Sequence, residues 1–234
     1  MRILTVIFCL SFALGQAQDL SLVTPFGVRF VNYFPSNKSA EKMTYSDIKG
    51  SCFSNKEWSP AILVLKVGQP IRLKKVKMNF YTNEVQYQDD SGKEFVALNG
   101  ITMVIMINRN DTTKVGGIFR SLASLRINTT EGFAQVLNEG KTRLIKRNTT
   151  SIVKETDPFS HEPQQIFTSL IEYYIGIYSQ DAVPLKTLSK ASVLSIVKPT
   201  PEHEQWLKTN KNKLKSEADI AAYFTFLNKS DQSK

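Results

Sequence analysis

The sequence predicts an α+β protein made mainly of antiparallel β-strands, with a short helical segment at its C-terminal end. Two observations predict this class. Apolar and polar residues alternate along residues 71–98, interrupted twice by turn residues, whereas apolar residues take a helical spacing only after residue 187. Strands followed by helices are typical of helices packed at one end of an antiparallel sheet, or of a small helical tail unit.

The first turn of the regular stretch predicts a buried face. A reversal at residues 82–83 places Phe80 opposite Val85. The same register brings Met78 opposite Tyr87, so both pairs lie on one face of a two-stranded ribbon.

The second turn predicts the same face. A three-residue loop at 90–92, with Gly92 in the left-handed conformation, places Tyr87 opposite Phe95. Two turns that agree are a stronger argument than either alone. The predicted buried face of the three strands comprises Met78, Phe80, Val85, Tyr87, Phe95 and Ala97.

Positive charge gathers at the start of this stretch. Ile71 and Leu73 are out of phase with Val76, which predicts a bulge or bend near residues 74–75. Such a bend would gather four cations on one edge, as a candidate surface for anionic lipid or acidic polysaccharide: Arg72, Lys74, Lys75 and Lys77. The alternative is that these side chains guard an edge strand against aggregation.

Shorter signals predict the remaining strands. We expect strands at 62–67, 101–107 and 116–119, a hairpin of 133–137 with 142–147, and a hairpin of 171–178 with 183–185. Residues 101–107 are apolar at both parities, which indicates burial on both faces. Residues 148–163 have the composition of a loop.

Three helices are expected near the C-terminus. The first covers residues 188–197, and the second begins with Thr200 as N-cap and Pro201 at its first position. The third begins with Ser216 as N-cap and Asp219 three residues later. The chain therefore divides into a signal peptide, an antiparallel β domain and a helical segment, at 1–17, 18–186 and 187–234.

The N-terminus has the pattern of a secretory signal peptide. An apolar run at residues 3–14 precedes Gly15-Gln16-Ala17, a small-x-small cleavage site. We expect cleavage near Ala17, a secreted or periplasmic location, and no transmembrane segment in the mature chain. Cys52 would then be the only cysteine left, and we interpret it as a small buried hydrophobe.

The chain carries a net charge of +9, and removal of Arg2 with the signal peptide leaves +8. The basic excess is compatible with anionic lipid or acidic polysaccharide as a partner, but solvated strand and helix faces are the preferred explanation, because none of the basic clusters is a continuous run. No recognition motif points to nucleic acid.

No residue pattern predicts a catalytic residue, a cofactor site or a metal site. His161 and His203 are the only histidines, and neither has a second histidine at the spacing of a metal motif. Gly116-Gly117 lacks the lysine of a phosphate loop. The Asn-x-Ser/Thr pattern occurs at Asn37, Asn110, Asn128, Asn148 and Asn228, and it matters only if the source glycosylates proteins.

Several segments together resemble a family of secreted proteins of unknown function from Bacteroidota-type bacteria. They are Gly50-Ser51-Cys52-Phe53 before Trp58, the strand at Val64-Leu65, the stretch 71–98 and the ending at 211–228. Cys52 stands where the family has proline, and residues 77–81 match the family's tyrosine-rich strand only loosely. The resemblance implies a shared fold and export, and it carries over no catalytic residue.

Three functional hypotheses follow. The first is a non-enzymatic envelope or extracellular protein that binds a partner or an anionic surface. The second is a carrier of a hydrophobic ligand in a sheet-lined pocket, which a large apolar cavity would favour. The third is a hydrolase of envelope or extracellular polymers, which converging carboxylates in a cleft would favour.

Overall fold

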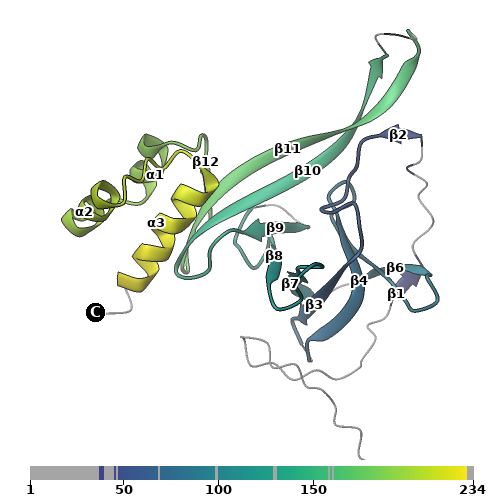
Figure 1. The fold of residues 1–234 in the computed structure, drawn as a ribbon, viewed down its shortest axis with the longest axis horizontal. Helices are drawn as coiled ribbons and strands as arrows, with labels where there is room; N and C mark the ends of the chain where they lie inside the picture. Colours follow the sequence, from purple (N-terminus) through teal and green to yellow (C-terminus); the bar gives the residue numbers. More distant parts are fainter. Residues whose placement is uncertain are drawn as a thin grey trace, which may run out of the picture.

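The computed structural model describes residues 37–39, 45, 47–67, 69–97, 100–128, 131–157, 159 and 161–230. It confirms the α+β class: one large, mostly antiparallel sheet is followed by three C-terminal helices (Figure 1). The predicted signal peptide at 1–17 lies outside the described residues.

The sheet contains twelve strands among the described residues. They are β1 Asn37–Ser39, β2 Ile48–Lys49, β3 Ser59–Leu65, β4 Ile71–Asn79, β5 Glu84–Gln88, β6 Glu94–Ala97, β7 Ile101–Ile107, β8 Val115–Ser121, β9 Phe133–Val136, β10 Thr142–Thr156, β11 Pro163–Ile177 and β12 Val183–Leu185. The order across the sheet is β1-β6-β5-β4-β3-β7-β8-β9-β10-β11-β12, with β2 pairing parallel to β11.

The predicted buried face of β4, β5 and β6 is confirmed. Met78, Val85 and Tyr87 are buried in one core, and the other three members of the predicted set pack against it. Tyr87 lies opposite Phe95, as the loop at 90–92 predicted, and the two rings stack with centroids 5.3 Å apart. Gly92 has the expected positive φ of 86°.

The register of β4 with β5 differs from the prediction by two residues. Met78 lies opposite Val85, so the turn contains residues 80–83 instead of two residues. The carboxamide oxygen of Asn79 explains the longer turn, because it accepts hydrogen bonds from the amides of Tyr81 and Thr82 at 2.9 and 3.1 Å. A shift of two residues preserves the buried face.

The predicted bulge in β4 is confirmed. Ser59 pairs with Val76 and Ala61 with Leu73, so three steps along β4 match two along β3. The extra residue lies at 74–75, where two exposed lysines meet. The bulge returns Ile71 and Leu73 to the core face that Val76 also occupies.

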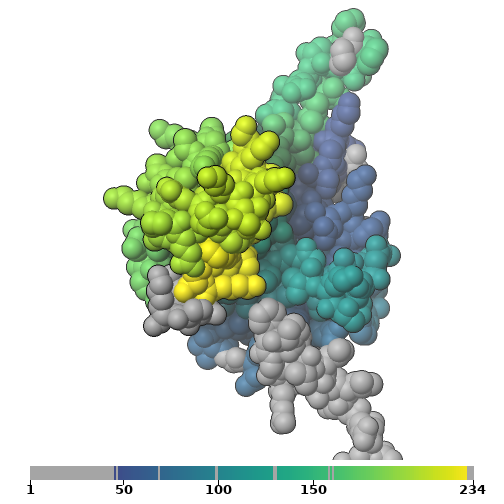
Figure 2. Space-filling view, turned by 60° about the vertical axis from the view of Figure 1, so that its left-hand side comes forward, coloured from purple at the N-terminus to yellow at the C-terminus, as the bar shows by residue number. Residues whose placement is uncertain are grey.

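The prediction of a loop at residues 148–163 is wrong. β10 and β11 form one long hairpin whose pairing continues from Thr142 opposite Ile177 to Thr156 opposite Pro163. The outer part of the hairpin projects beyond the body of the protein (Figures 1 and 2). Many of its side chains are exposed and polar, and this polar composition resembles that of a loop.

The three predicted helices are confirmed as α1 Lys190–Ile196, α2 Pro201–Thr209 and α3 Glu217–Ser230. Thr200 caps α2, and the amide of Asp219 donates to the Ser216 hydroxyl at 3.1 Å. The helices cover the base of the long hairpin and share a second core with it (Figure 1). That core includes Leu144, Ile175, Leu185, Val193, Leu207, Leu214, Ile220, Tyr223, Phe224 and Leu227.

The sheet curves so that the β4–β5 turn reaches β10. The backbone amide of Thr150 donates to the carbonyl of Phe80 at 3.0 Å. The ring of Phe80 lies 6.2 Å from that of Phe119 on β8. These contacts close a circuit through β4, β3, β7, β8, β9 and β10, and one end of that circuit is open.

Candidate functional site

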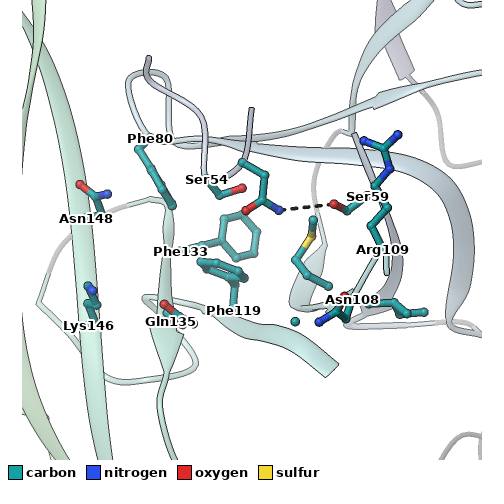
Figure 3. Close-up of a pocket in the computed structure, with 14 residues that line it drawn as sticks. Ser54, Ser59, Phe80, Asn108, Arg109, Phe119, Phe133, Gln135, Lys146 and Asn148 are labelled. Atoms are coloured by element: carbon teal, nitrogen blue, oxygen red, sulfur yellow. Dashed lines mark hydrogen bonds between the residues drawn. The ribbon is translucent and has the colours of Figure 1, made fainter. Parts of the chain in front are cut away.

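A pocket of about 440 Å³ occupies the open end of the curved sheet (Figure 3). Every strand of the circuit or a loop beside it contributes a lining residue. The lining comprises Ser54, Asn55, Ser59, Phe80, Met106, Ile107, Asn108, Arg109, Gly116, Phe119, Phe133, Gln135, Lys146 and Asn148.

Three phenylalanines form the apolar part of the pocket. Phe119 is only 7 % exposed, while Phe80 and Phe133 are half-buried and pack against the main core. Figure 3 shows the three rings in the centre of the pocket, between the polar residues of β10 and those near β3 and β7. An aromatic face of this kind packs well against a flat, partly apolar ring of a ligand.

Carboxamides supply most of the hydrogen-bonding groups. The Oδ1 atom of Asn148 is buried and has no hydrogen-bond partner. Gln135 lies beside it on β9, because Gln135 pairs with Lys146, two residues before Asn148. Each carboxamide offers both donors and an acceptor, so the pair matches ligand hydroxyl groups, which also do both. A buried acceptor left without a partner costs about 1–3 kcal/mol, which a bound ligand would recover.

One cation lies at each side of the pocket. Lys146 Nζ donates to Glu217 Oε1 at 2.9 Å, and Arg109 pairs with Glu57 at 3.3 Å. Both carboxylates lie outside the lining, and the described lining residues include no Asp or Glu. The pocket therefore presents amides, hydroxyls and two cations around an apolar centre.

A second hydrogen bond holds the lysine's partner in place. The hydroxyl of Tyr173 donates to the same Oε1 of Glu217 at 2.6 Å. Burial tends to raise the pKa of Glu217, but hydrogen bonds from Lys146 and Tyr173 outweigh it and the pKa lies below its ordinary value. Burial first, and then the bond to Glu217, raise the pKa of Tyr173 to about 12. The pocket thus connects directly to the first turn of α3.

The four cations predicted as a surface site all lie on β4. This strand lies between β3 and β5 in the strand order, but the pairing with β5 covers residues 76–79, so the part of β4 that carries Arg72, Lys74 and Lys75 pairs with β3 alone among the described strands. The surface site at these cations stays a prediction. Lys74 pairs with Asp90 at 3.0 Å and Lys75 donates to Gln88 at 2.8 Å. Lys77 lies over the rings of Phe53 and Trp58, at 5.0 and 4.8 Å from their centroids. Arg72 is half-buried on the same strand.

Cys52 and His203, which were also considered in the sequence, have roles in the fold. Cys52 is a buried free thiol, and burial raises its pKa. His203 accepts at Nδ1 from the Thr200 amide at 3.2 Å and so completes the cap of α2. Among the described residues, no three His, Cys, Asp or Glu side chains cluster as metal ligands.

The glycosylation patterns fall in contrasting environments. Asn228 is 7 % exposed and bonds the β9–β10 connection, and Asn148 lines the pocket. Asn110 and Asn128 are exposed. The side chain of Asn37 lies outside the described residues.

No pattern in the sequence predicted the pocket. Its residues come from six strands or their loops, and no spacing in the sequence connects Asn55 with Gln135. Lys146 lies in the strand predicted at 142–147, whereas Asn148 lies at the start of the segment predicted as a loop, and both belong to β10. The β-branched residues Thr149, Thr150, Ile152 and Val153 were the signal for a longer strand there.

Comparison with known proteins found no matching family model, no matching curated protein and no matching solved structure. The resemblance to secreted proteins of Bacteroidota-type bacteria therefore stays a prediction. None of the helices in the described part of the chain has the length and apolar character needed to cross a membrane.

Proposed function

We propose that this chain is an exported, non-enzymatic binding protein whose pocket holds an acidic saccharide unit. The observation that carries the proposal is the combination in one pocket of three phenylalanine rings, carboxamides that include the unpaired Oδ1 atom of Asn148, and a cation on either side. A sugar ring has an apolar C–H face for the rings and hydroxyls for the carboxamides. A carboxylate on the sugar adds attraction to Lys146 and Arg109.

The lining argues against the two alternatives. A carrier of a hydrophobic ligand needs a mostly apolar wall, whereas eight of the fourteen lining residues have polar or charged side chains: Ser54, Asn55, Ser59, Asn108, Arg109, Gln135, Lys146 and Asn148. A polymer hydrolase of the usual kind needs paired carboxyl groups, and the described lining contains none.

Isothermal titration calorimetry of the full chain with a trimer of galacturonic acid and with a trimer of glucose tests this proposal. We expect measurable binding of the acidic trimer that weakens as salt rises, and binding of the glucose trimer at least about tenfold weaker. Failure of the acidic trimer to bind at about 1 mM would refute the proposal.

Substitutions locate the binding site. The double variant Gln135→Ala with Asn148→Ala should bind at least about tenfold more weakly, whereas Asn110→Ala, at an exposed position outside the pocket, should bind like the parent. The variant with Arg72, Lys74, Lys75 and Lys77 all changed to Gln should also bind like the parent. If this last variant loses binding and the double variant keeps it, the saccharide binds on β4 and the pocket proposal is wrong.

A further inference from the structure

β11 has a stretch of unpaired edge between two other strands. β2 pairs with Gln165 and Ile166, and β12 pairs with β11 from Tyr173 to Ile175. Of the six residues between, the central four, 168–171, are all exposed. Two of these four residues are large and apolar: the exposed fraction is 61 % for Leu170 and 46 % for Ile171.

The hydrogen bonds of β10 show which β11 backbone groups point outward. The Tyr178 amide donates to the Lys141 carbonyl, so residues at odd positions of β10 bond to β11. Even positions point away from β11, since Thr150 donates to Phe80 and Leu144 accepts from Leu137. In an antiparallel ladder bonded and non-bonded pairs alternate.

The same alternation applies to the partners on β11. Thr150 lies opposite Ser169, and Asn148 lies opposite Ile171. Both pairs are therefore of the non-bonded kind, and the N–H and C=O groups of Ser169 and Ile171 point out from the edge of the sheet. Gly50, after β2, lies against Phe167, so the free part of the edge begins beyond Phe167.

A pocket of about 370 Å³ adjoins this edge where β12 ends. Its apolar lining comes from Ile171, Tyr173, Pro184, Leu185 and Leu188. Ile171 and Tyr173 are two residues apart on one strand, so they share a face of the sheet. A strand added to the edge would place alternate side chains on that face, next to the pocket.

A lysine stands at each end of the free edge. Lys49 ends β2, and Lys186 follows β12. Both are exposed, and neither forms an ion pair within the described part of the chain. An incoming strand with a carboxylate near each end would complement both charges.

A second copy of the chain does not fit this edge. If two β11 edges paired through a twofold axis, β11 of one copy would have to occupy the position that β2 and β12 of the other copy already hold beside its own β11. The exposed stretch of the β11 edge between β2 and β12, residues 168–171, is four residues or roughly 13 Å long. It therefore admits a short extended segment and excludes a long strand.

We propose that the edge of β11 at residues 168–171 binds a short extended peptide by strand addition. Its backbone pairs with Ser169 and Ile171, one apolar side chain enters the pocket beside Ile171 and Leu188, and flanking carboxylates face Lys49 and Lys186. Main-chain hydrogen bonds supply attraction and the pocket supplies selectivity. The pocket beside this edge shares no lining residue with the proposed saccharide pocket.

Hydrogen exchange of the full chain with the labelled pentapeptide Glu-Val-Leu-Val-Glu tests the proposal. In the free protein the amides of Ser169 and Ile171 should exchange fast, and that of Leu170, which bonds to β10, should exchange slowly. Addition of the peptide should slow exchange at Ser169 and Ile171 at least about tenfold. Protection of Ser169 and Ile171 without peptide would refute the proposal, as would absence of binding at about 1 mM.

Matched variants separate backbone pairing from other modes of binding. Ser169→Pro removes an outward N–H and should weaken binding at least about tenfold, whereas Ser169→Ala should bind like the parent. Ile171→Ser should weaken binding more than Leu170→Ser, because Leu170 faces away from the pocket. If Ser169→Pro does not fold, the same peptide N-methylated at its central residues should fail to bind the parent protein. Equal binding of methylated and unmethylated peptide, or a peptide-induced dimer in sedimentation, would overturn the proposal.

Discussion

The hydroxyl of Tyr173 and the ammonium of Lys146 converge on one oxygen of Glu217, at 2.6 and 2.9 Å. Two strands at the base of the long hairpin are thereby bonded to the first turn of α3. The same lysine lines the 440 Å³ pocket of the curved sheet, so the junction of hairpin and helix also positions a pocket residue.

This junction predicts a pH dependence of stability. The pKa of Glu217 is lowered by folding, so its contribution is present above its ordinary pKa and is lost as pH falls. The pKa of Tyr173 is raised from 10.0 to about 12, so its contribution is full below pH 10 and is lost as pH rises toward 12. Urea denaturation across this pH range measures both limbs.

Glu217→Gln is the variant that checks this interpretation. It should lower the free energy of unfolding at pH 7 by about 1 kcal/mol, a modest value because the carboxylate is 36 % exposed. It should also flatten the acid limb of the stability profile. An acid limb as steep as that of the parent would show that other carboxyl groups cause it.

Core substitutions should differ according to burial. Tyr87→Ala removes a fully buried ring and should cost about 3–5 kcal/mol in the free energy of unfolding. Phe80→Ala removes a half-buried ring at the pocket and should cost less, about 1–3 kcal/mol. Equal losses in urea denaturation would contradict the difference in burial.

Cys52 should be unreactive in the folded protein. Its side chain is 1 % exposed and its thiol pKa is raised by burial, so both access and thiolate formation are suppressed. We expect a thiol-specific colorimetric reagent at pH 8 to react on the timescale of unfolding, and rapidly in denaturant. Rapid reaction without denaturant would show that Cys52 is accessible.

Asn228 should contribute strongly to stability. Its carboxamide accepts from the Thr142 amide at 2.8 Å and donates to the carbonyls of Thr142 and Glu139 at 2.8 and 3.0 Å. Asn228→Ala removes all three bonds and leaves the part-buried Thr142 amide without this partner, so it should cost about 1–3 kcal/mol in thermal or urea unfolding. The matched change Asn110→Ala, at an exposed site, should cost less than about 0.5 kcal/mol.

Local chemistry made part of the fold predictable. The loop that contains Gly92 predicted the pairing of Tyr87 with Phe95, and the N-cap residues Thr200 and Ser216 predicted the starts of two helices. Turns and helix caps are predictable because they depend on residues a few positions apart. The β4–β5 register was not predictable to the residue, since it depends on how the Asn79 side chain bonds to the following turn. Turns of different length are compatible with the same residues, and the bonds from Asn79 select the longer turn.

The candidate sites depend on long-range contacts that no spacing reveals. The pocket combines Asn55 with Asn148, and the edge of β11 is free only because β2 and β12 stop short of each other. The basic residues of β4 were visible in the sequence, but their neighbours in the sheet follow from the strand order and pairing. The sites can therefore be predicted only after the strand order of the sheet is known.

The bonds from Asn228 to Thr142 join residues 86 positions apart in the sequence. The second core, which unites the hairpin base with Tyr223, Phe224 and Leu227, cannot form until α3 has been synthesised. A nascent chain that has reached only β12 would expose the apolar face at Leu144 and Ile175. Completion of the second core thus waits until residues 217–230 are available to pack on the hairpin base.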